Sequence, residues 1–379
     1  MNKLTAEELI RYSRHLVLTD FGIEAQLKLK STRVLVVGAG GLGCPVLLYL
    51  TAAGVGTIGI ADFDVVQESN LQRQILFTTD DIGRNKSEAA VERLAKLNPF
   101  PAFTAYPVKL TRHNALEIIT HYDLVIDGSD NFPTRYLVND ACVLCNKPLV
   151  YGAILQYEGQ VAVFNIVKKD GTRSANYRDL FPHPPRPDEV PNCEEAGVLG
   201  VLPGIVGSLM ANEAIKLLTG KGELLAGKLF LFDSQVLHTT TLTIPDRNGR
   251  NYITELIDYE LFCGINQNKN KSLGMKEVTV QELKQMLDNG EDFQLIDVRE
   301  SYENELSNLG GELIPMAEVP HNIASISKTK KVVIHCRSGG RSGNIIQWLE
   351  KNHGFDNLYN LKGGILAWAR EIDPSLPVS

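Results

Sequence analysis

The sequence contains few cysteines and no strong excess of charge of either sign. Six cysteines scattered over 379 residues are too few for the disulfide framework of a small secreted domain. The formal net charge of −7 argues against nonspecific binding to nucleic acid or to anionic membranes as the main activity. The first stretch, MNKLTAEELIRYSRHLVL, carries charges where a secretory signal needs an apolar core. We therefore expect a cytoplasmic protein with no nucleic-acid partner and no membrane partner.

Long uninterrupted hydrophobic runs are also absent. Residues 34–61 carry no charge and are long enough to cross a bilayer, but seven glycines and Pro45 interrupt them. These breaks divide the region into a strand at 33–37, a helix at 44–54 and a second strand at 57–64. The pattern predicts elements of a soluble globular domain and not a membrane span.

Strands and helices continue to alternate after this region. Residues 85–99 form a helical pattern that Pro99 stops, and residues 123–130 form a buried strand that runs into a polar loop. This alternation predicts an α/β fold with a parallel sheet covered by helices on both faces, a doubly wound sheet. A chain of 379 residues is long enough for two or three domains.

Two irregular stretches interrupt the alternating pattern. Residues 176–200 are proline-rich, acidic and without a period, which predicts an exposed and mobile crossover. Residues 265–274 are polar and poor in apolar side chains, as is typical of an interdomain linker. We therefore predict a first domain at 1–264, a linker at 265–275 and a second, small α/β domain at 276–379.

Three glycines lie directly between the first strand and the first helix. Gly38, Gly40 and Gly43 have the spacing G-x-G-x-x-G, which lets backbone N–H groups approach a phosphate at the positive end of a helix. Asp62 ends the next strand, where an acidic side chain can accept hydrogen bonds from a ribose. These residues predict a nucleotide site. The alternative is that the glycines only form a tight turn between strand and helix.

The residues after Asp62 help to distinguish between nucleotides. A nicotinamide dehydrogenase would share the glycines and the aspartate, but Asn70, Arg73 and Lys86 can hold further phosphates and so indicate a triphosphate. Asp130 follows the C-terminal end of a strand, where ligands of open α/β sheets bind, and a carboxylate beside phosphates is a natural magnesium ligand. The alternative is that the two cations are solvated surface charges and Asp130 is a turn residue.

Several long motifs carry a family resemblance over residues 1–260. They include GAGGLG, ADFDVVQESNLQRQ, GRNKSEAA, DGSDNFPTRYLVND and GVLGVLPGIVGSLMANEAIKLLTG. This set resembles the ubiquitin-activating-like adenylyltransferases that serve sulfur carrier proteins, such as the activators of molybdopterin synthase and of thiamine synthesis. The resemblance implies a Rossmann-like sheet of the ubiquitin-activating-enzyme type, ATP with magnesium at Asp130, and a homodimer in which Arg14 reaches the neighbouring subunit's site. It also implies that the residues in contact with ATP are Gly41, Asp62, Ser69, Asn70, Arg73, Lys86, Asp130 and Asn131.

The implied reaction has a simple physical basis. The C-terminal carboxylate of a small ubiquitin-like carrier is a poor acylating agent, so it attacks the α-phosphorus of ATP, expels pyrophosphate and becomes an acyl adenylate. Arg73, Lys86 and the magnesium would offset the charge that builds on the phosphates. Positioning of the two substrates would supply the rest of the rate.

Three cysteines of the first domain are predicted to be structural. Cys142 and Cys145 form a C-x-x-C pair, but they share one helical stripe with Val138 and Ala141 and have no second pair at zinc spacing. Core packing is the better interpretation. Cys44, at the start of the first helix, is expected to be a small buried residue.

The resemblance also bears on a metal and on a covalent intermediate. In the resembled family two C-x-x-C pairs commonly bind a structural zinc, but here Asn176 and Asp179 replace the first pair and Cys263 stands alone at the second. We therefore expect no zinc, although Asp179 and Cys263 could in principle form a poorer site. Cys193, in an acidic loop, matches the family cysteine that can form an acyl disulfide or a thioester with the carrier.

Cys336 lies between a strand and the loop RSGGRSG. Glycines, a helix N-terminus and two arginines surround the thiol, so we expect an anion nest in which it ionises below its free pKa of about 8.5. The alternative is a structural cysteine at a strand end. The C-x4-R spacing, with LIDVRESYENEL before it and NLKGGILAWAR after it, resembles a rhodanese sulfurtransferase domain at 276–376. The resemblance implies a persulfide on Cys336, held in the loop of Arg337, Ser338, Gly339, Gly340 and Arg341.

The two resemblances together imply one sequence of reactions. A donor such as a cysteine desulfurase loads Cys336, the persulfide attacks the adenylated carrier, and a second thiol such as Cys193 resolves the acyl disulfide to release a thiocarboxylate. The catalytic candidates are therefore Arg73, Lys86, Asp130, Cys193 and Cys336. Three alternatives stay open: an NAD-dependent oxidoreductase with an accessory rhodanese domain, a scaffold that binds a carrier without adenylylating it, and a ubiquitin-type conjugation activator that uses a Cys193 thioester.

Overall fold

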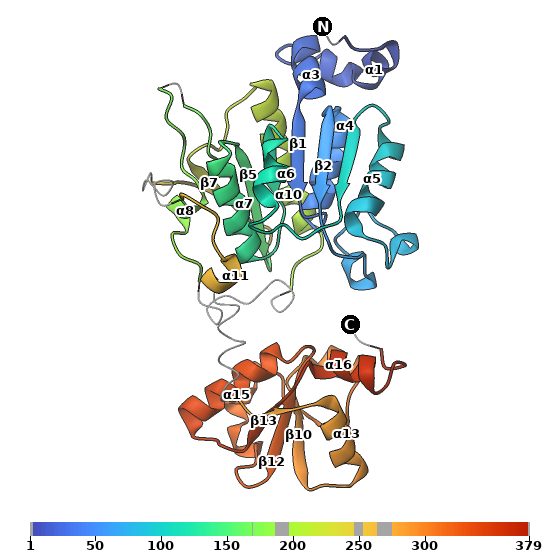
Figure 1. Ribbon diagram of the computed structural model, residues 1–379, viewed down its shortest axis with the longest axis vertical. Coiled ribbons are helices and arrows are strands. Elements are labelled where there is room, and N and C mark those ends of the chain that lie inside the picture. The colour runs from blue at the N-terminus through green and yellow to red at the C-terminus, as the bar shows by residue number, and fades with distance from the viewer. Residues whose placement is uncertain (1–2, 169, 186–196, 246–252, 264–274, 378–379) are drawn as a thin grey trace. The chain divides into compact units, whose positions relative to one another are not determined.

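The computed structural model describes residues 3–168, 170–185, 197–245, 253–263 and 275–377. The chain divides into two compact units, Met1–Gly264 and Ile265–Ser379 (Figure 1). The predicted linker at 265–275 lies almost entirely outside the described ranges, so its bounds stay a prediction.

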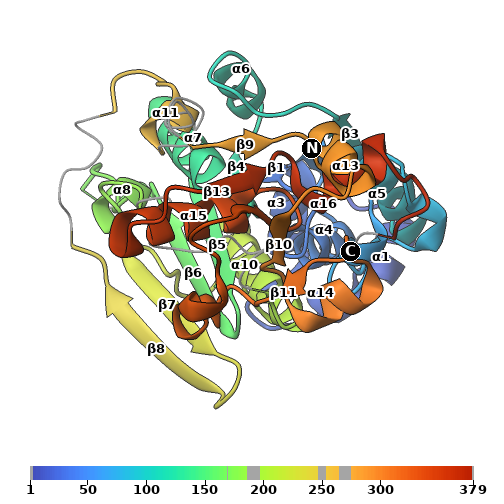
Figure 2. The same ribbon diagram turned by 90° about the horizontal axis from the view of Figure 1, so that it is seen from below.

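The first unit is built on a sheet that has eight strands in the described ranges. Their order is β3-β2-β1-β4-β5-β6-β7-β8. The strands from β3 to β5 pair in parallel, whereas β5, β6, β7 and β8 pair antiparallel, with β8 at the outer edge (Figure 2). The bounds are β1 (Arg33–Val37), β2 (Thr57–Ala61), β3 (Ala102–Tyr106), β4 (Leu124–Asp127), β5 (Leu149–Leu155), β6 (Glu158–Phe164), β7 (Lys228–Asp233) and β8 (His238–Thr243).

Helices cover both faces of this sheet. α4, α5 and α10 share one hydrophobic core with it, and α6, α7, α8 and α11 share the other. None of the helices in the described ranges combines the length and the apolar character needed to cross a bilayer. The bounds are α1 (Ala6–Arg11), α2 (Ser13–Leu16), α3 (Gly22–Ser31), α4 (Gly43–Ala53), α5 (Lys86–Leu97), α6 (Ala115–Thr120), α7 (Phe132–Leu144), α8 (Tyr177–Leu180), α10 (Leu202–Thr219) and α11 (Tyr259–Phe262), with the short 3-10 helix η1 (Glu68–Asn70).

Strand β1 shows why the sequence of this sheet reads as continuous apolar runs. Val34 and Val36 point into the core that contains α4, and Leu35 and Val37 point into the core that contains α7. A parallel strand covered on both faces buries successive side chains, as at residues 34–37, so it cannot alternate apolar with polar residues. The predicted doubly wound sheet is therefore confirmed.

The helix predicted at 44–54 is α4, and its end depends on a glycine. Gly54 follows α4 with φ of +82°, in the left-handed region that favours glycine. A Cβ at this position would lie 2.4 Å from a ring atom of Tyr12, so the packing of Tyr12 also requires the missing side chain. This close fit holds the N-terminal segment against the end of α4.

The second unit is a smaller parallel α/β domain with its own cores. The five strands found among its described residues follow the order β11-β10-β12-β13-β9. Val332 and Ile334 of β12 enter one core and Val333 enters the other, so helices cover both faces here too. The bounds are β9 (Glu277–Val278), β10 (Phe293–Asp297), β11 (Glu312–Leu313), β12 (Lys331–His335), β13 (Leu358–Leu361), α13 (Val280–Asp288), α14 (Ser301–Leu306), α15 (Gly340–His353) and α16 (Gly364–Glu371).

The prediction of an exposed crossover at 176–200 is wrong for its first residues. Asn176 and Asp179 are buried, and Asp179 Oδ2 accepts hydrogen bonds from the backbone N–H and the side-chain Nδ2 of Asn176, both at 2.8 Å. Arg178 binds Asp140 of α7 through Nε at 2.9 Å and Nη2 at 2.7 Å. Tyr259 of α11 donates its hydroxyl to the same carboxylate at 2.8 Å. This buried polar network anchors the start of the crossover, and the predicted pattern missed it because its partners are distant in the sequence.

Candidate active sites

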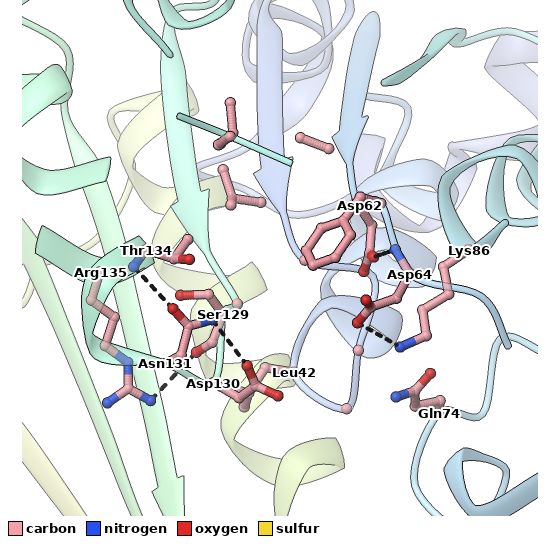
Figure 3. A pocket seen from close by; sticks show the side chains of 18 of the residues that line it. Leu42, Asp62, Asp64, Gln74, Lys86, Ser129, Asp130, Asn131, Thr134 and Arg135 are labelled. Atoms are coloured by element: carbon pink, nitrogen blue, oxygen red, sulfur yellow. Dashed lines mark hydrogen bonds and ion pairs between the residues drawn. The ribbon is translucent and has the colours of Figure 1, made fainter. Parts of the chain in front are cut away.

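A cavity of about 400 Å³ opens at the C-terminal ends of the parallel strands in the first unit. It lies where the sheet order reverses, since β1 has β2 on one side and β4 on the other. Ligands of open α/β sheets bind at such a reversal. Figure 3 shows Asp62, Asp64 and Lys86 on one side of the cavity and Asp130 and Arg135 on the other.

The glycine loop between β1 and α4 leaves no room for a side chain at Gly38 or at Gly43. Gly38 has φ of +88°, and a Cβ at Gly43 would lie 1.9 Å from the carbonyl oxygen of Gly38. Gly38, Gly40 and Gly41 border the cavity, which brings backbone close to any bound ligand. Gly43 contributes by allowing the turn and not by lining the cavity.

Asp62 braces this glycine loop from the end of β2. Its carboxylate accepts hydrogen bonds from the backbone N–H groups of Ala39 at 2.8 Å and Asp64 at 2.9 Å. Burial raises the pKa of Asp62, while the positive charge of Lys86 and these two N–H donors act in the opposite direction. Both carboxylate oxygens thus have protein partners, and Asp62 also borders the cavity.

Two of the predicted cations border the cavity. Lys86 begins α5, is largely buried, and places Nζ 3.4 Å from Asp64 Oδ2. Arg73 donates from Nη1 to the carbonyl oxygen of Ser69 at 3.1 Å. The structure therefore brings Arg73 and Lys86 together with the glycine loop at one cavity, and their contact with phosphates stays a prediction.

Other predicted contact residues are not among the described residues that border the cavity. Ser69 and Asn70 lie in η1, where Asn70 Oδ1 accepts the backbone N–H of Gln67 at 3.3 Å. Arg14 lies exposed in α2. Their predicted contacts with ATP stay predictions.

Asp130 and Asn131 lie between β4 and α7. Asn131 caps α7 by accepting the backbone N–H of Thr134 at 3.0 Å, and its Nδ2 lies 3.3 Å from Asp130 Oδ1. Asp130 is exposed at the cavity. The cap fixes the loop, so the Asp130 carboxylate is presented from a defined position.

Arg135 and Asp127 were missed by the sequence analysis. Arg135 is only 8% exposed, borders the cavity, donates to the carbonyl oxygen of Ser129 at 3.4 Å and lies over the ring of Tyr151. Burial raises the pKa of Asp127, which accepts the backbone N–H of Ser129 at 2.9 Å. The available signal was a carboxylate at the end of the apolar strand LVID and an arginine one helical turn after a cap residue.

Cys336 of the second unit is enclosed by backbone donors. It follows β12, is 1% exposed, and its Sγ accepts the N–H of Gly339 at 3.2 Å and of Ser342 at 3.5 Å. Gly339 has φ of +95°, which turns the loop into the N-terminus of α15. Ser338 and Gly340 are exposed and Arg337 is half-buried. These two N–H groups form a nest of the expected kind around the thiol.

Arg341 binds the carboxylate of Glu303, whereas its position in the loop suggests the Cys336 thiol as its partner. Its Nη1 and Nη2 each lie 2.7 Å from the carboxylate of Glu303 in α14, a bidentate ion pair. The hydrogen bond to Glu303 raises the pKa of Arg341. Arg341 therefore fixes the loop to α14, and Glu303 is a site residue that the sequence analysis missed.

The remaining described cysteines are chiefly packing residues. Burial raises the pKa of Cys44 and of Cys263 to about 12, and it raises that of Cys142 well above its ordinary value. Cys145 is half-buried, with Sγ 3.6 Å from the hydroxyl of Thr120. The part of the chain that the structure describes holds no group of three or more metal-ligating side chains. Cys193 lies outside the described residues.

The two units thus define a nucleotide-binding α/β domain followed by a domain with a nested thiol. The chain belongs to the ThiF family, whose model matches residues 12–252, and it carries a rhodanese-like domain at residues 279–371. It is an adenylyltransferase and a sulfurtransferase, as predicted. Membership in an adenylyltransferase family implies the use of ATP and disfavours the nicotinamide alternative.

Named relatives span nearly the whole chain. The probable adenylyltransferase/sulfurtransferase MoeZ of Mycobacterium tuberculosis is 45% identical over 98% of this chain and 96% of its own length. The adenylyltransferase and sulfurtransferase MOCS3 of Drosophila grimshawi is 40% identical over 99% and 87%. The sulfur carrier protein adenylyltransferase of Thermus thermophilus is 55% identical over 69% of this chain and 98% of its own length.

Solved structures agree on the fold of the first unit. The crystal structure of PaaA matches with a TM-score of 0.55 at 23% identity, over 64% of this chain and 76% of that one. Escherichia coli MccB with ATP matches with a TM-score of 0.54 at 23% identity, over 62% and 71%. At this identity the likeness bears on the fold alone.

Proposed function

We propose that the chain converts the C-terminal carboxylate of a small ubiquitin-like sulfur carrier protein into a thiocarboxylate. The first unit adenylylates the carboxylate with ATP, and the second delivers sulfur from a persulfide on Cys336. The observation that carries this proposal is that one chain combines a cavity bordered by Arg73, Lys86 and Asp130 with a thiol held by two backbone donors. The relative named sulfur carrier protein adenylyltransferase supports the choice of carrier.

In the adenylylation step we assign the phosphates to the cationic side of the cavity. Lys86 and Arg73 offset negative charge on the phosphates, and the glycine loop allows them to approach α4 closely. Ser69, Asn70 and Asn131 add polar contacts. The carboxylate of the carrier attacks the α-phosphorus, the bond to pyrophosphate breaks, and the acyl adenylate remains.

Asp130 fits a magnesium ion. Its carboxylate is exposed at the cavity, on a loop fixed by the Asn131 cap, and carboxylate oxygens together with phosphate oxygens are the ligands that magnesium prefers. Magnesium bound there would neutralise charge on the phosphates. No zinc is part of the proposal.

We further infer a cytoplasmic homodimer. Arg14 would enter the neighbouring subunit's cavity, and its exposure in α2 is compatible with this role. Two strongly exposed apolar residues flank it, Ile10 at 77% and Val17 at 75%, which suits a surface that a second copy covers.

In the sulfur step the terminal sulfur of the persulfide attacks the acyl carbonyl and AMP leaves. The product is an acyl disulfide to Cys336. Attack of a second thiol on Cys336 Sγ then breaks the sulfur–sulfur bond of the acyl disulfide, releases the thiocarboxylate and leaves a protein disulfide that an external thiol reduces. We assign the second thiol to Cys193, and a cysteine desulfurase reloads Cys336.

Mass spectrometry of candidate carriers tests the proposal. After incubation with ATP, magnesium and a persulfide donor, the carrier should exchange one terminal oxygen for sulfur. Cys336→Ala should abolish this exchange but leave carrier-dependent exchange of pyrophosphate into ATP intact. If no carrier supports pyrophosphate exchange, the proposal is wrong. Transfer of the carrier to another protein would instead identify a conjugation activator.

A further inference from the structure

A hydrogen-bonded cluster connects Cys336 to the neighbouring strand β13. Ser342, in the first turn of α15, places Oγ 3.4 Å from Cys336 Sγ and 2.7 Å from Asn360 Oδ1. Asn360, in β13, donates from Nδ2 to the carbonyl oxygen of Gly339 at 3.1 Å. Ser342 is fully buried and Asn360 is 7% exposed. Two consecutive elements, α15 and β13, are therefore linked beside the sulfur through neutral side chains.

The donors and acceptors of this cluster fix the direction of each hydrogen bond. A backbone carbonyl only accepts, so the amide nitrogen of Asn360 must face Gly339 and its Oδ1 must face Ser342. An amide oxygen also only accepts, so the single hydroxyl proton of Ser342 goes to Asn360. Ser342 Oγ then presents lone pairs to Cys336, an arrangement that suits a thiol and disfavours an anionic sulfur.

The cluster therefore has two arrangements of one proton. While Cys336 is a thiol, the Ser342 proton lies on the short contact to Asn360. When the sulfur becomes anionic, a charge-assisted hydrogen bond from Ser342 to Sγ becomes stronger than the one to Asn360. Ser342 then donates its proton to Sγ and gives up the 2.7 Å hydrogen bond to Asn360.

We propose that Asn360 is a positioning residue of the sulfur site. Asn360 competes with Cys336 for the hydroxyl proton of Ser342, so the hydrogen bond from Ser342 to the sulfur forms only when the sulfur becomes anionic. Asn360 also holds the loop in shape through Gly339. The inference rests on the proposed role of Cys336 in sulfur transfer and names two residues that tune that role.

The charged groups around Cys336 must be considered in any measurement of its ionisation. The loop and α15 contribute Arg337 and Arg341, α14 contributes Glu303 bound to Arg341, and β12 contributes the buried His335. The start of α16 contributes only backbone, since the N–H of Ile365 donates to the carbonyl oxygen of Cys336. Ser342→Ala and Asn360→Leu change none of these charges.

A double-mutant cycle in the full chain tests the proposal. The wild type, Asn360→Leu, Ser342→Ala and the double variant are alkylated with iodoacetamide across a pH series, and modification of the Cys336 peptide is read by mass spectrometry. Ser342→Ala, which removes a donor to the anion, should raise the pH of half-maximal alkylation rate by about one unit. Asn360→Leu should lower it by about half a unit, because the Ser342 proton is then available to the sulfur. In the Ser342→Ala background, Asn360→Leu should shift this pH clearly less than in the wild type, because only its contact with Gly339 is then left to lose.

Asn357→Leu is the matched control. Asn357 precedes β13 and donates to the carbonyl oxygen of Ser327 at 2.8 Å, so its loss affects packing without touching Ser342. It should leave the pH of half-maximal alkylation unchanged, and Asn360→Ala should shift that pH in the same direction as Asn360→Leu. An equal effect of Asn360→Leu with and without Ser342, or a shift upward, would overturn the proposal. Because alkylation reads the thiol directly, this outcome is independent of whether Cys336→Ala loses thiocarboxylate formation.

Discussion

The two sites of the chain handle negative charge in different ways. The cavity of the first unit is open and bordered by side chains of both signs, including Asp62, Lys86, Asp130 and Arg135. Cys336, by contrast, is 1% exposed and accepts hydrogen bonds from backbone N–H groups, while Arg341 of its loop is already bound to Glu303.

This difference follows from what each site must hold. A triphosphate brings several charges that change position during reaction, and side-chain cations can follow them. A single sulfur needs only one fixed location, and a rigid loop supplies donors there without any reorganisation. We therefore expect substitutions of side chains to affect the first site most strongly, whereas the second depends on the shape of its loop.

The largest expected effect comes from Lys86→Ala. Loss of this cation should reduce carrier-dependent pyrophosphate exchange by about 10²–10³-fold, because charge on the phosphates is no longer offset. Sulfur transfer from thiosulfate to cyanide by the second unit should be unchanged. Lys96→Ala on the same helix, where Lys96 is exposed and paired with Glu92, is the control and should leave both activities intact. Equal losses of pyrophosphate exchange in Lys86→Ala and Lys96→Ala would show that the effect is not specific to the cavity.

The next effect concerns the pH dependence of the second unit. Burial lowers the pKa of His335 to about 4, against the opposite influence of the Asp297 carboxylate. The unfolded chain binds this proton near pH 6.5 and the folded unit only near pH 4. The free energy of unfolding should therefore decrease by about 3 kcal/mol as the pH is lowered from 6.5 to 4. Asp297, whose pKa is also lowered in the folded state despite its burial, adds to the loss only at still lower pH.

Tryptophan fluorescence can follow this loss directly. Both tryptophans, Trp348 and Trp368, lie in the second unit, so urea unfolding monitored by their emission reports that unit. His335→Gln should flatten the dependence between pH 6.5 and 4. A slope that persists in the variant would assign the effect to another group.

A smaller effect is expected from Glu303→Gln. The side chain of Glu303 is buried and that of Arg341 is 17% exposed, so weakening this pair should cost about 2 kcal/mol in the unfolding of the second unit. Because the pair fixes the loop, sulfur transfer should fall as well, while pyrophosphate exchange stays constant. Glu305→Gln, an exposed position of the same helix, serves as the control. No change in either stability or sulfur transfer would show that the pair does not hold the loop.

The smallest effect belongs to the polar network of the first unit. Tyr259→Phe removes one hydrogen bond to Asp140 and should destabilise that unit by about 1 kcal/mol. Thermal unfolding followed by circular dichroism measures this change, with the exposed Tyr49→Phe as reference. A neutral result for Tyr259→Phe would mean that Arg178 alone anchors the crossover to Asp140.

The features that the sequence predicted well are those written in contiguous motifs. The strand, glycine loop and helix of residues 33–54 follow one another, so their geometry is set locally. Lys86 and Asp130 could be placed at one cavity because both follow strands of a parallel sheet, whose C-terminal ends meet at one edge.

The features that the sequence missed depend on how distant segments align. Glu303 reaches Arg341 only because α14 lies beside the loop, and Asn360 reaches Ser342 only through the register of β13. The burial of Asp179 likewise depends on residues from other segments that pack over it. The composition of residues 176–200 alone is typical of an exposed loop. A single sequence carries no signal for such pairings.

One consequence follows from the cysteines that the cores enclose. A sulfane sulfur atom can migrate to any accessible thiolate nearby, and scrambling of this kind would waste the cargo. Because burial keeps Cys44, Cys142 and Cys263 protonated, these thiols are poor nucleophiles toward a persulfide. The hydrophobic interior thus protects the reactive cargo from three of the chain's own cysteines.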